Sequence, residues 1–157
     1  MATFTIESNG RLEKTAVYYN GEQIAGIKEL FVNIDEEGTF DAILQYEGSD
    51  KNIHTKSIFE DYMDNLKLVP PSFTDEEATA LREFTIESDG DLGDTWLFLE
   101  DEPLDGVVEV LVHIKATDNK NGLRSLFNKS KIPEMVEFKA QITFRNEDDS
   151  IETEDIF

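Results

Sequence analysis

The chain has 157 residues, enough for one ordinary domain or two very small ones. Its 35 acidic and 14 basic residues give a formal net charge of −21, which argues against unaided binding to nucleic acid or anionic membrane surfaces. There is no cysteine, so disulfides and cysteine-based metal sites are excluded, while a hydrophobic content of 39% suffices for a core.

The first 59 residues have the pattern of half-buried antiparallel strands. Phe4 and Ile6 alternate with polar residues, and the same period of two recurs over residues 29–34 and 40–46. Turn signals separate these runs: Asn9-Gly10, Asn20-Gly21, Glu37-Gly38 and Gly48-Ser49. We expect about five strands here, connected as a meander.

Residues 60–83 form a linker that does not share this pattern. Pro70-Pro71 interrupts regular structure. Thr74 and Glu77 then have the spacing of a capping box, which predicts a short helix over about 74–82.

Residues 84–157 repeat the pattern of residues 1–59. The segment FTIESNG at 4–10 returns as FTIESDG at 84–90, and the apolar positions agree at this offset of 80 as far as Ile114. Agreement resumes at an offset of 98, where Phe40, Ala42, Leu44 and Tyr46 match Phe138, Ala140, Ile142 and Phe144. The second copy therefore carries an insertion at about 116–135, in which Leu123, Leu126 and Phe127 predict a helix over about 121–130.

We therefore predict a mainly β protein made by tandem duplication of a roughly five-stranded antiparallel unit. The units are 1–59 and 84–157. Because a lone five-stranded sheet needs its apolar face covered, packing of the units as one sandwich is favoured over two separate bodies.

No motif for catalysis or cofactor binding is present. His54 and His113 lie in strand patterns without a nucleophile or ligand motif, and each is expected to be solvated. The loop 88–100 is rich in carboxylates, but Gly93 and Asp94 reverse the order that an EF-hand turn needs. A polar hairpin turn is the simpler interpretation, and calcium binding in another geometry stays open. We predict a non-enzymatic protein without cofactor or metal.

Charge is unevenly distributed in the second copy. Residues 83–109 contain ten acids and no base, residues 147–155 contain six acids and no base, and residues 115–131 contain five bases and one acid. Three interpretations compete: a solvated surface, an acidic face for a basic partner, or an insertion that docks on the acidic body or on a neighbouring subunit.

The acidic-face interpretation specifies candidate residues, including carboxylates two apart, such as Glu152 with Glu154 and Asp89 with Asp91, that recur along one side of a strand. The candidate partner-binding residues are Glu87, Asp89, Asp91, Asp94, Glu100, Asp101, Glu102, Asp105, Glu147, Asp148, Asp149, Glu152, Glu154 and Asp155. The candidate insertion contacts are Arg124, Leu126, Phe127 and Lys129.

The segment from Tyr18 to Phe40 resembles small β modules in uncharacterised proteins carried by phages and prophages. The matching residues are Asn20, Gly21, Ile24, Gly26, Leu30, Val32 and Ile34, repeated as Leu104, Gly106, Val110, Val112 and Ile114. The second copy departs at the turn, where Glu100-Asp101 replaces Asn20-Gly21. The resemblance implies a small bacterial or phage accessory protein, a context in which acidic proteins often block host nucleic-acid-binding defence proteins.

We therefore predict an acidic protein-binding accessory factor of the phage-inhibitor type. The expected partner is a basic, nucleic-acid-binding host protein, with no direct contact to nucleic acid or membrane. The start MATFTIESNG lacks the basic and apolar regions of a signal peptide, so a cytoplasmic location is expected. The alternative is a structural or assembly module of a phage or similar particle, which would act as a homo-oligomer.

Overall fold

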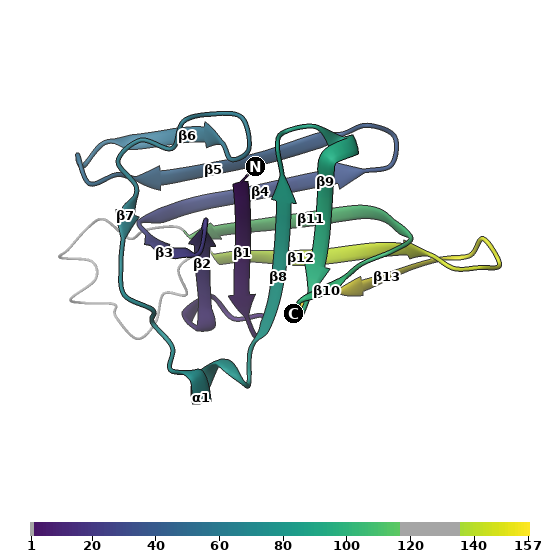
Figure 1. The fold of residues 1–157 in the computed structure, drawn as a ribbon. Helices are drawn as coiled ribbons and strands as arrows, with labels where there is room; N and C mark the ends of the chain where they lie inside the picture. Colours follow the sequence, from purple (N-terminus) through teal and green to yellow (C-terminus); the bar gives the residue numbers. More distant parts are fainter. Residues whose placement is uncertain (1, 117–135) are drawn as a thin grey trace.

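A computed structural model describes residues 2–116 and 136–157. Its strands form two antiparallel sheets that lie face to face (Figure 1). Seven strands make sheet A, in the order β10-β9-β8-β1-β2-β3-β7, and six make sheet B, in the order β13-β12-β11-β4-β5-β6. The prediction of a mainly β protein is confirmed.

The first three strands of the chain belong to sheet A, and the next three belong to sheet B. Strands β1 (Ala2–Ser8), β2 (Thr15–Tyr19) and β3 (Glu22–Ala25) belong to sheet A, with a 3₁₀ turn η1 (Leu12–Lys14) between the first two. Strands β4 (Ile27–Asp35), β5 (Phe40–Glu47) and β6 (Ile53–Ser57) then form one half of sheet B.

The second half of the chain follows the same route. Strands β8 (Arg82–Ser88), β9 (Thr95–Leu99) and β10 (Glu102–Pro103) belong to sheet A, with η2 (Leu92–Asp94) before β9. Strands β11 (Val107–Ala116), β12 (Val136–Arg145) and β13 (Ile151–Asp155) complete sheet B. Each half thus has six described strands divided between two sheets, rather than a single meander of about five.

Gly26 explains why the first half divides after β3. Its φ of 81° lies in the left-handed region, and a Cβ atom there would come within 2.5 Å of the Glu47 carbonyl oxygen. The backbone turns at this glycine out of β3 and into β4. Gly106, at φ 73°, occupies the matching place between β10 and β11.

The linker contributes little regular structure. It adds the short strand β7 (Lys67–Leu68) beside β3 and a single helical turn, α1 (Asp75–Ala78). The capping box of Thr74 and Glu77 is confirmed, but the predicted helix to residue 82 is wrong at its end. Arg82 instead begins β8, because its backbone faces Ser8 of β1 in the sheet. The predicted helix at 121–130 lies outside the described residues.

The two halves meet at the centre of both sheets. In sheet A, β1 pairs with β8 and Thr5 lies opposite Thr85, with their hydroxyl oxygens 3.0 Å apart. In sheet B, β4 pairs with β11 and Val32 lies opposite Val112. Residues 80 positions apart therefore face each other in both layers.

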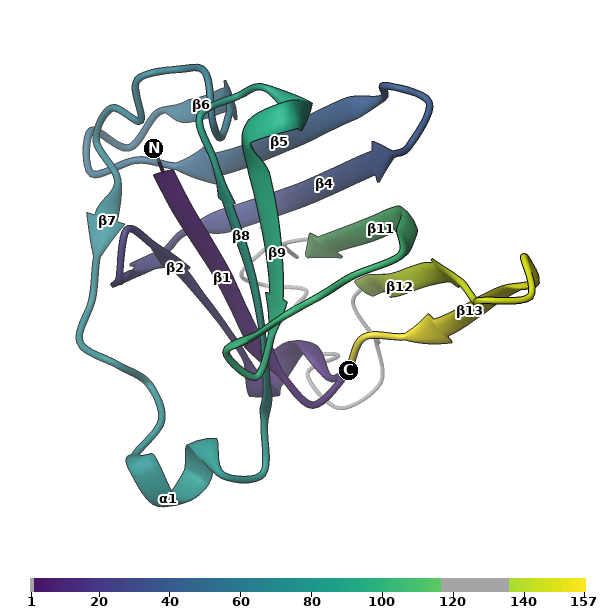
Figure 2. The same ribbon diagram turned by 45° about the vertical axis from the view of Figure 1, so that its right-hand side comes forward.

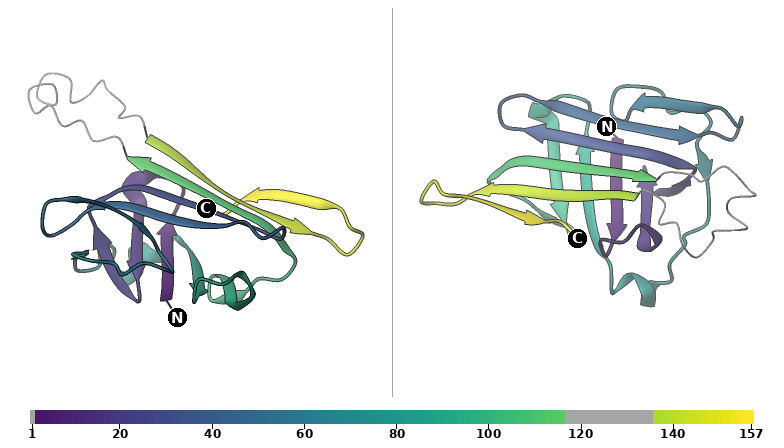
Figure 3. Two further views of the ribbon diagram at one scale, coloured as in Figure 1. Left: turned by 90° about the horizontal axis from the view of Figure 1, so that it is seen from above. Right: turned by 180° about the vertical axis from the view of Figure 1, so that it is seen from behind.

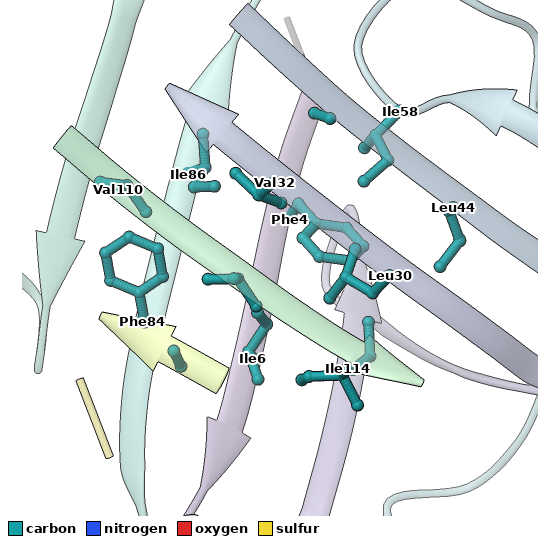
Figure 4. Close-up of a cluster of buried hydrophobic side chains, with 14 of the residues drawn as sticks. Phe4, Ile6, Leu30, Val32, Leu44, Ile58, Phe84, Ile86, Val110 and Ile114 are labelled. Atoms are coloured by element: carbon teal, nitrogen blue, oxygen red, sulfur yellow. The ribbon is translucent and has the colours of Figure 1, made fainter. Parts of the chain in front are cut away.

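The core fills the space between the sheets, whose strands cross at a steep angle (Figures 1 and 2). Figure 4 shows Phe4, Ile6, Phe84 and Ile86 of sheet A facing side chains of sheet B such as Val32. All five are at most 1% exposed, which confirms the predicted inward face of β1 and β8. No helix in the described part of the chain has the length and hydrophobicity needed to cross a membrane.

Candidate protein-binding face

The acids predicted from sequence lie at several separate places. Asp89, Asp91 and Asp94 belong to the η2 connection at one end of β8 and β9, whereas Glu100, Asp101 and Glu102 lie at the opposite end. Glu147, Asp148 and Asp149 form the turn before β13, which carries Glu152, Glu154 and Asp155. Glu87 lies on β8 and Asp105 between β10 and β11. The contacts predicted for Arg124, Leu126, Phe127 and Lys129 lie outside the described residues.

The η2 acids hold a turn together. The Asp89 carboxylate accepts a hydrogen bond from the Asp91 backbone N–H, and Asp91 accepts one from Gly93, each at 3.0 Å. The first half has a counterpart of the Asp89–Asp91 bond, because the Arg11 backbone N–H donates to the Asn9 side-chain oxygen. Asp89 and Asp91 therefore lie in a turn, not in a row along a strand, and the charge of Asp89 raises the pKa of Asp94. Within residues 2–116 and 136–157, no cluster of three or more histidine or carboxylate groups is arranged to hold a metal ion.

Strand β13 is an exposed edge of sheet B. Its hairpin with β12 extends beyond sheet A (Figure 3). Glu154 lies opposite Ile142, which is 1% exposed, so Glu152 and Glu154 point to the side of the sheet that carries the core. Charged residues that point inward on an edge strand discourage pairing with further strands. Protection of this sheet edge therefore accounts for Glu152 and Glu154, and no binding partner is needed to explain them.

The outer face of sheet A has a different composition. This surface is turned toward the viewer in Figure 1. A transverse row of side chains crosses it, because strand register places Tyr18, Thr5, Thr85 and Phe98 side by side. Glu87 and Trp96 lie opposite each other on one side of this row, and Glu7 and Glu83 on the other. We call Glu7, Tyr18, Glu83, Glu87, Trp96 and Phe98 the aromatic–acidic face.

The carboxylates of this face repel one another. Glu7 and Glu83 occupy directly opposed positions on β1 and β8, an arrangement that costs stability when both are charged. Burial raises the pKa of Glu83, and the charges of Asp101, Glu7 and Glu100 raise it further. The Tyr18 hydroxyl donates a hydrogen bond to Glu7 at 3.2 Å. Burial, together with the Glu7 charge, raises the pKa of Tyr18 to about 12.

The central strands of this face carry no cation that would balance these charges. The ten outward positions on the central strands β2, β1, β8 and β9, all among the described residues, carry no lysine or arginine. They are Ala16, Tyr18, Thr3, Thr5, Glu7, Glu83, Thr85, Glu87, Trp96 and Phe98. The face thus combines negative charge with aromatic side chains, the residue type enriched at the centres of protein interfaces.

Trp96 is the most exposed aromatic residue of the face. It is the only tryptophan of the chain and is 58% exposed. The sequence-based candidates include Glu87 but neither Trp96 nor Phe98. The available signal was the run WLFL at 96–99, which places apolar residues on both sides of a strand whose outer side is open.

Both histidines were expected to be solvated, but the structure pairs each of them with a carboxylate. His54 Nε2 lies 3.0 Å from Asp50 and its ring stacks on Tyr46. His113 Nε2 lies 2.6 Å from Glu29, and its ring packs against Phe31 in a T-shaped arrangement. Both pairs lie on sheet B, away from the aromatic–acidic face.

The comparisons with known proteins return no relative. No family model, no curated protein sequence and no solved structure matches the chain.

Proposed function

We propose that this protein is a non-enzymatic accessory factor whose aromatic–acidic face binds a basic protein. The proposal rests on one observation: Glu7, Glu83 and Glu87 share a sheet face with the exposed Trp96. The central positions of this face carry no base that would compensate the charge. A cationic partner surface would relieve the repulsion between the carboxylates. The aromatic side chains would supply apolar contact area.

The charge of the whole chain supports the same proposal. A net charge of −21 creates a long-range field that attracts a cationic partner and accelerates encounter at low salt. The carboxylates outside the aromatic–acidic face, such as those of the β12–β13 turn, contribute to this field without touching the partner. Specific contact is assigned to the face, and steering to the remaining acids.

The partner class follows from the resemblance and the charge together. We propose an inhibitor of the phage type that acts in the host cytoplasm on a basic nucleic-acid-binding protein, such as a defence protein. Such a partner has a cationic groove for phosphates, which carboxylates held on a rigid sheet can occupy. The two units are interpreted as products of tandem duplication, which the pairing of Thr5 with Thr85 and of Val32 with Val112 supports.

The test is a pull-down of bacterial lysate proteins with the tagged chain at low and high salt. We expect retention of a basic protein that is lost at high salt and in the double variant Glu83→Lys/Glu87→Lys. The matched control is Glu147→Lys/Asp149→Lys, which makes the same change in net charge in the exposed β12–β13 turn. If both variants lose the basic protein equally, the interaction depends on overall charge and not on the face. If both variants retain it, the proposed face is refuted.

A second candidate function is assembly into a larger particle through sheet B. Its outer face presents Ile43, which is 39% exposed, beside Phe31 on the neighbouring strand. Apolar residues at this position would favour self-association. Sedimentation of the protein as a monomer at high concentration, unchanged by Ile43→Lys, would argue against this candidate.

A further inference from the structure

A pocket of about 340 Å³ adjoins the aromatic–acidic face. It lies where η2 and β9 of sheet A meet the ends of β4 and β11 in sheet B. Its lining residues are Ile34, Asp35, Glu36, Leu92, Thr95, Trp96, Leu97, Leu104, Asp105, Gly106, Val107 and Val108. We call it the second-half pocket.

The first half contains a counterpart of about 230 Å³, the first-half pocket. Ten residues line it, and nine of them, all except Gln23, lie 80 positions before a residue of the second-half pocket. The two pockets therefore occupy the same place in each half. Features that both pockets share follow from the fold, whereas residues that differ between them are particular to one half.

The two pockets differ in charge. In the first-half pocket, Lys28 is the only charged lining residue. In the second-half pocket, Val108 replaces Lys28 and Asp105 replaces Ala25. Asp35 and Glu36 add two further acids, and no base is among its described lining residues. These two substitutions remove one cation and add one carboxylate.

The three carboxylates are not equivalent. Glu36 is already bound to Arg145. Asp35 accepts hydrogen bonds from the backbone N–H groups of Glu37 and Thr39, each at 3.0 Å. Asp105 is exposed at the turn before β11. Asp35 alternates with the inward-facing Ile34, so its carboxylate belongs to the outer side of sheet B. Asp105 therefore remains as the anionic group that an incoming cation would meet.

The pocket also has an apolar component. Leu92, Leu97 and Leu104 are half-buried and pack against the core. A ligand with a methylene stem and a cationic head fits such a combination, since the stem covers the leucines while the head meets Asp105. A phosphate or carboxylate ligand would be repelled, and a wholly apolar ligand would desolvate the acids without compensation.

We infer that the second-half pocket receives an arginine side chain of the basic partner, with the guanidinium group at Asp105. Arginine is favoured because its planar guanidinium can donate two parallel hydrogen bonds to the Asp105 carboxylate. Trp96 belongs both to the pocket lining and to the aromatic–acidic face, so one partner surface can contact both. The inference rests on the proposed function, since it specifies a contact made by that partner.

The single tryptophan permits a direct test, because fluorescence excited at wavelengths that tyrosine does not absorb reports on Trp96 alone. The probes are N-acetyl-arginine amide and its neutral near-isostere N-acetyl-citrulline amide, titrated separately at low salt. We expect a saturable change with the arginine probe and none with citrulline. Asp105→Ala, which installs the residue of the first-half pocket, should weaken arginine binding about threefold to tenfold. Asp149→Ala, an exposed acid in the β12–β13 turn, is the control and should change it less than twofold.

Two outcomes would overturn the inference: an equal response to both probes, or equal arginine affinity in Asp105→Ala and the parent protein. Its failure can be told apart from failure of the proposed function. If the pull-down succeeds and depends on Glu83 and Glu87 while the fluorescence titration shows no arginine binding, the partner uses the face without the pocket. If the pull-down retains no basic protein, the proposed function itself fails.

Discussion

Replacement of Gly26 by alanine tests whether the corner between the two sheets is as rigid as its geometry indicates. The backbone at Gly26 has φ 81°, a left-handed conformation that costs a non-glycine residue about 1–2 kcal/mol. The new Cβ atom would also lie 2.5 Å from the Glu47 carbonyl oxygen. That oxygen cannot move freely, because the Glu47 N–H donates to the Gly26 carbonyl at 2.8 Å.

Gly21 provides the matched control. Its φ of 86° imposes the same backbone cost, but nothing lies within 4 Å of the position of a Cβ atom. Alanine restricts the unfolded chain and recovers about 0.4–1 kcal/mol at either site, so Gly21→Ala should lose about 1 kcal/mol. The clash at Gly26 adds about 1–3 kcal/mol of overpacking, which predicts a total loss of about 2–4 kcal/mol. Gly106→Ala, with a closest approach of 3.1 Å, should fall between them.

Urea unfolding of the three variants at 25 °C measures these differences as shifts of the midpoint at constant slope. The expected order of stability loss is Gly26 first, Gly106 second and Gly21 last. If Gly26→Ala and Gly21→Ala lose stability equally, the corner yields to the added atom and the rigidity argument is refuted.

Two further predictions concern ionisation on the aromatic–acidic face. Burial and neighbouring charge raise the pKa of Glu83, so this carboxyl favours folding below its unfolded pKa and loses that contribution as the pH rises through its folded pKa. Glu83→Gln should therefore stabilise the protein more at about pH 7 than at about pH 4, and equal gains in urea unfolding would contradict the prediction. With its pKa raised to about 12, Tyr18 should ionise above the usual tyrosine range of about 10. In an ultraviolet titration, Tyr18→Phe should remove a late step, and a late step of unchanged amplitude in this variant would refute the assignment.

Local alternation made the strands predictable. The inward face of β1 could be identified from Phe4 and Ile6 because a period of two needs no knowledge of distant residues. Thr74 and Glu77 likewise predicted their capping box from spacing alone. The helix was placed too long because the pairing of Arg82 with Ser8 of β1 is a long-range contact, and such contacts override weak helix propensity.

The division into two sheets and the candidate face were not predictable in the same way. The match of Gly26 with Gly106 was visible, but only the positions of β3 and β4 show that the glycine turns the chain from one sheet into the other. The aromatic–acidic face depends on β1 lying beside β8, which brings Glu7 to Glu83 across 76 positions. The repeat gave equivalent strands but did not say which of them pair.

The pairing of β1 with β8 and of β4 with β11 has a consequence for folding during synthesis. Both central strand pairs join residues about 80 positions apart, so neither sheet can close until the second half has left the ribosome. Until then, β1 and β4 are open edges of a half-formed sandwich. Because residues 80 apart face each other in both pairs, the open edges of one unfinished chain are complementary to those of another. A truncated first half should therefore form a dimer, in which a second copy takes the place of the missing strands.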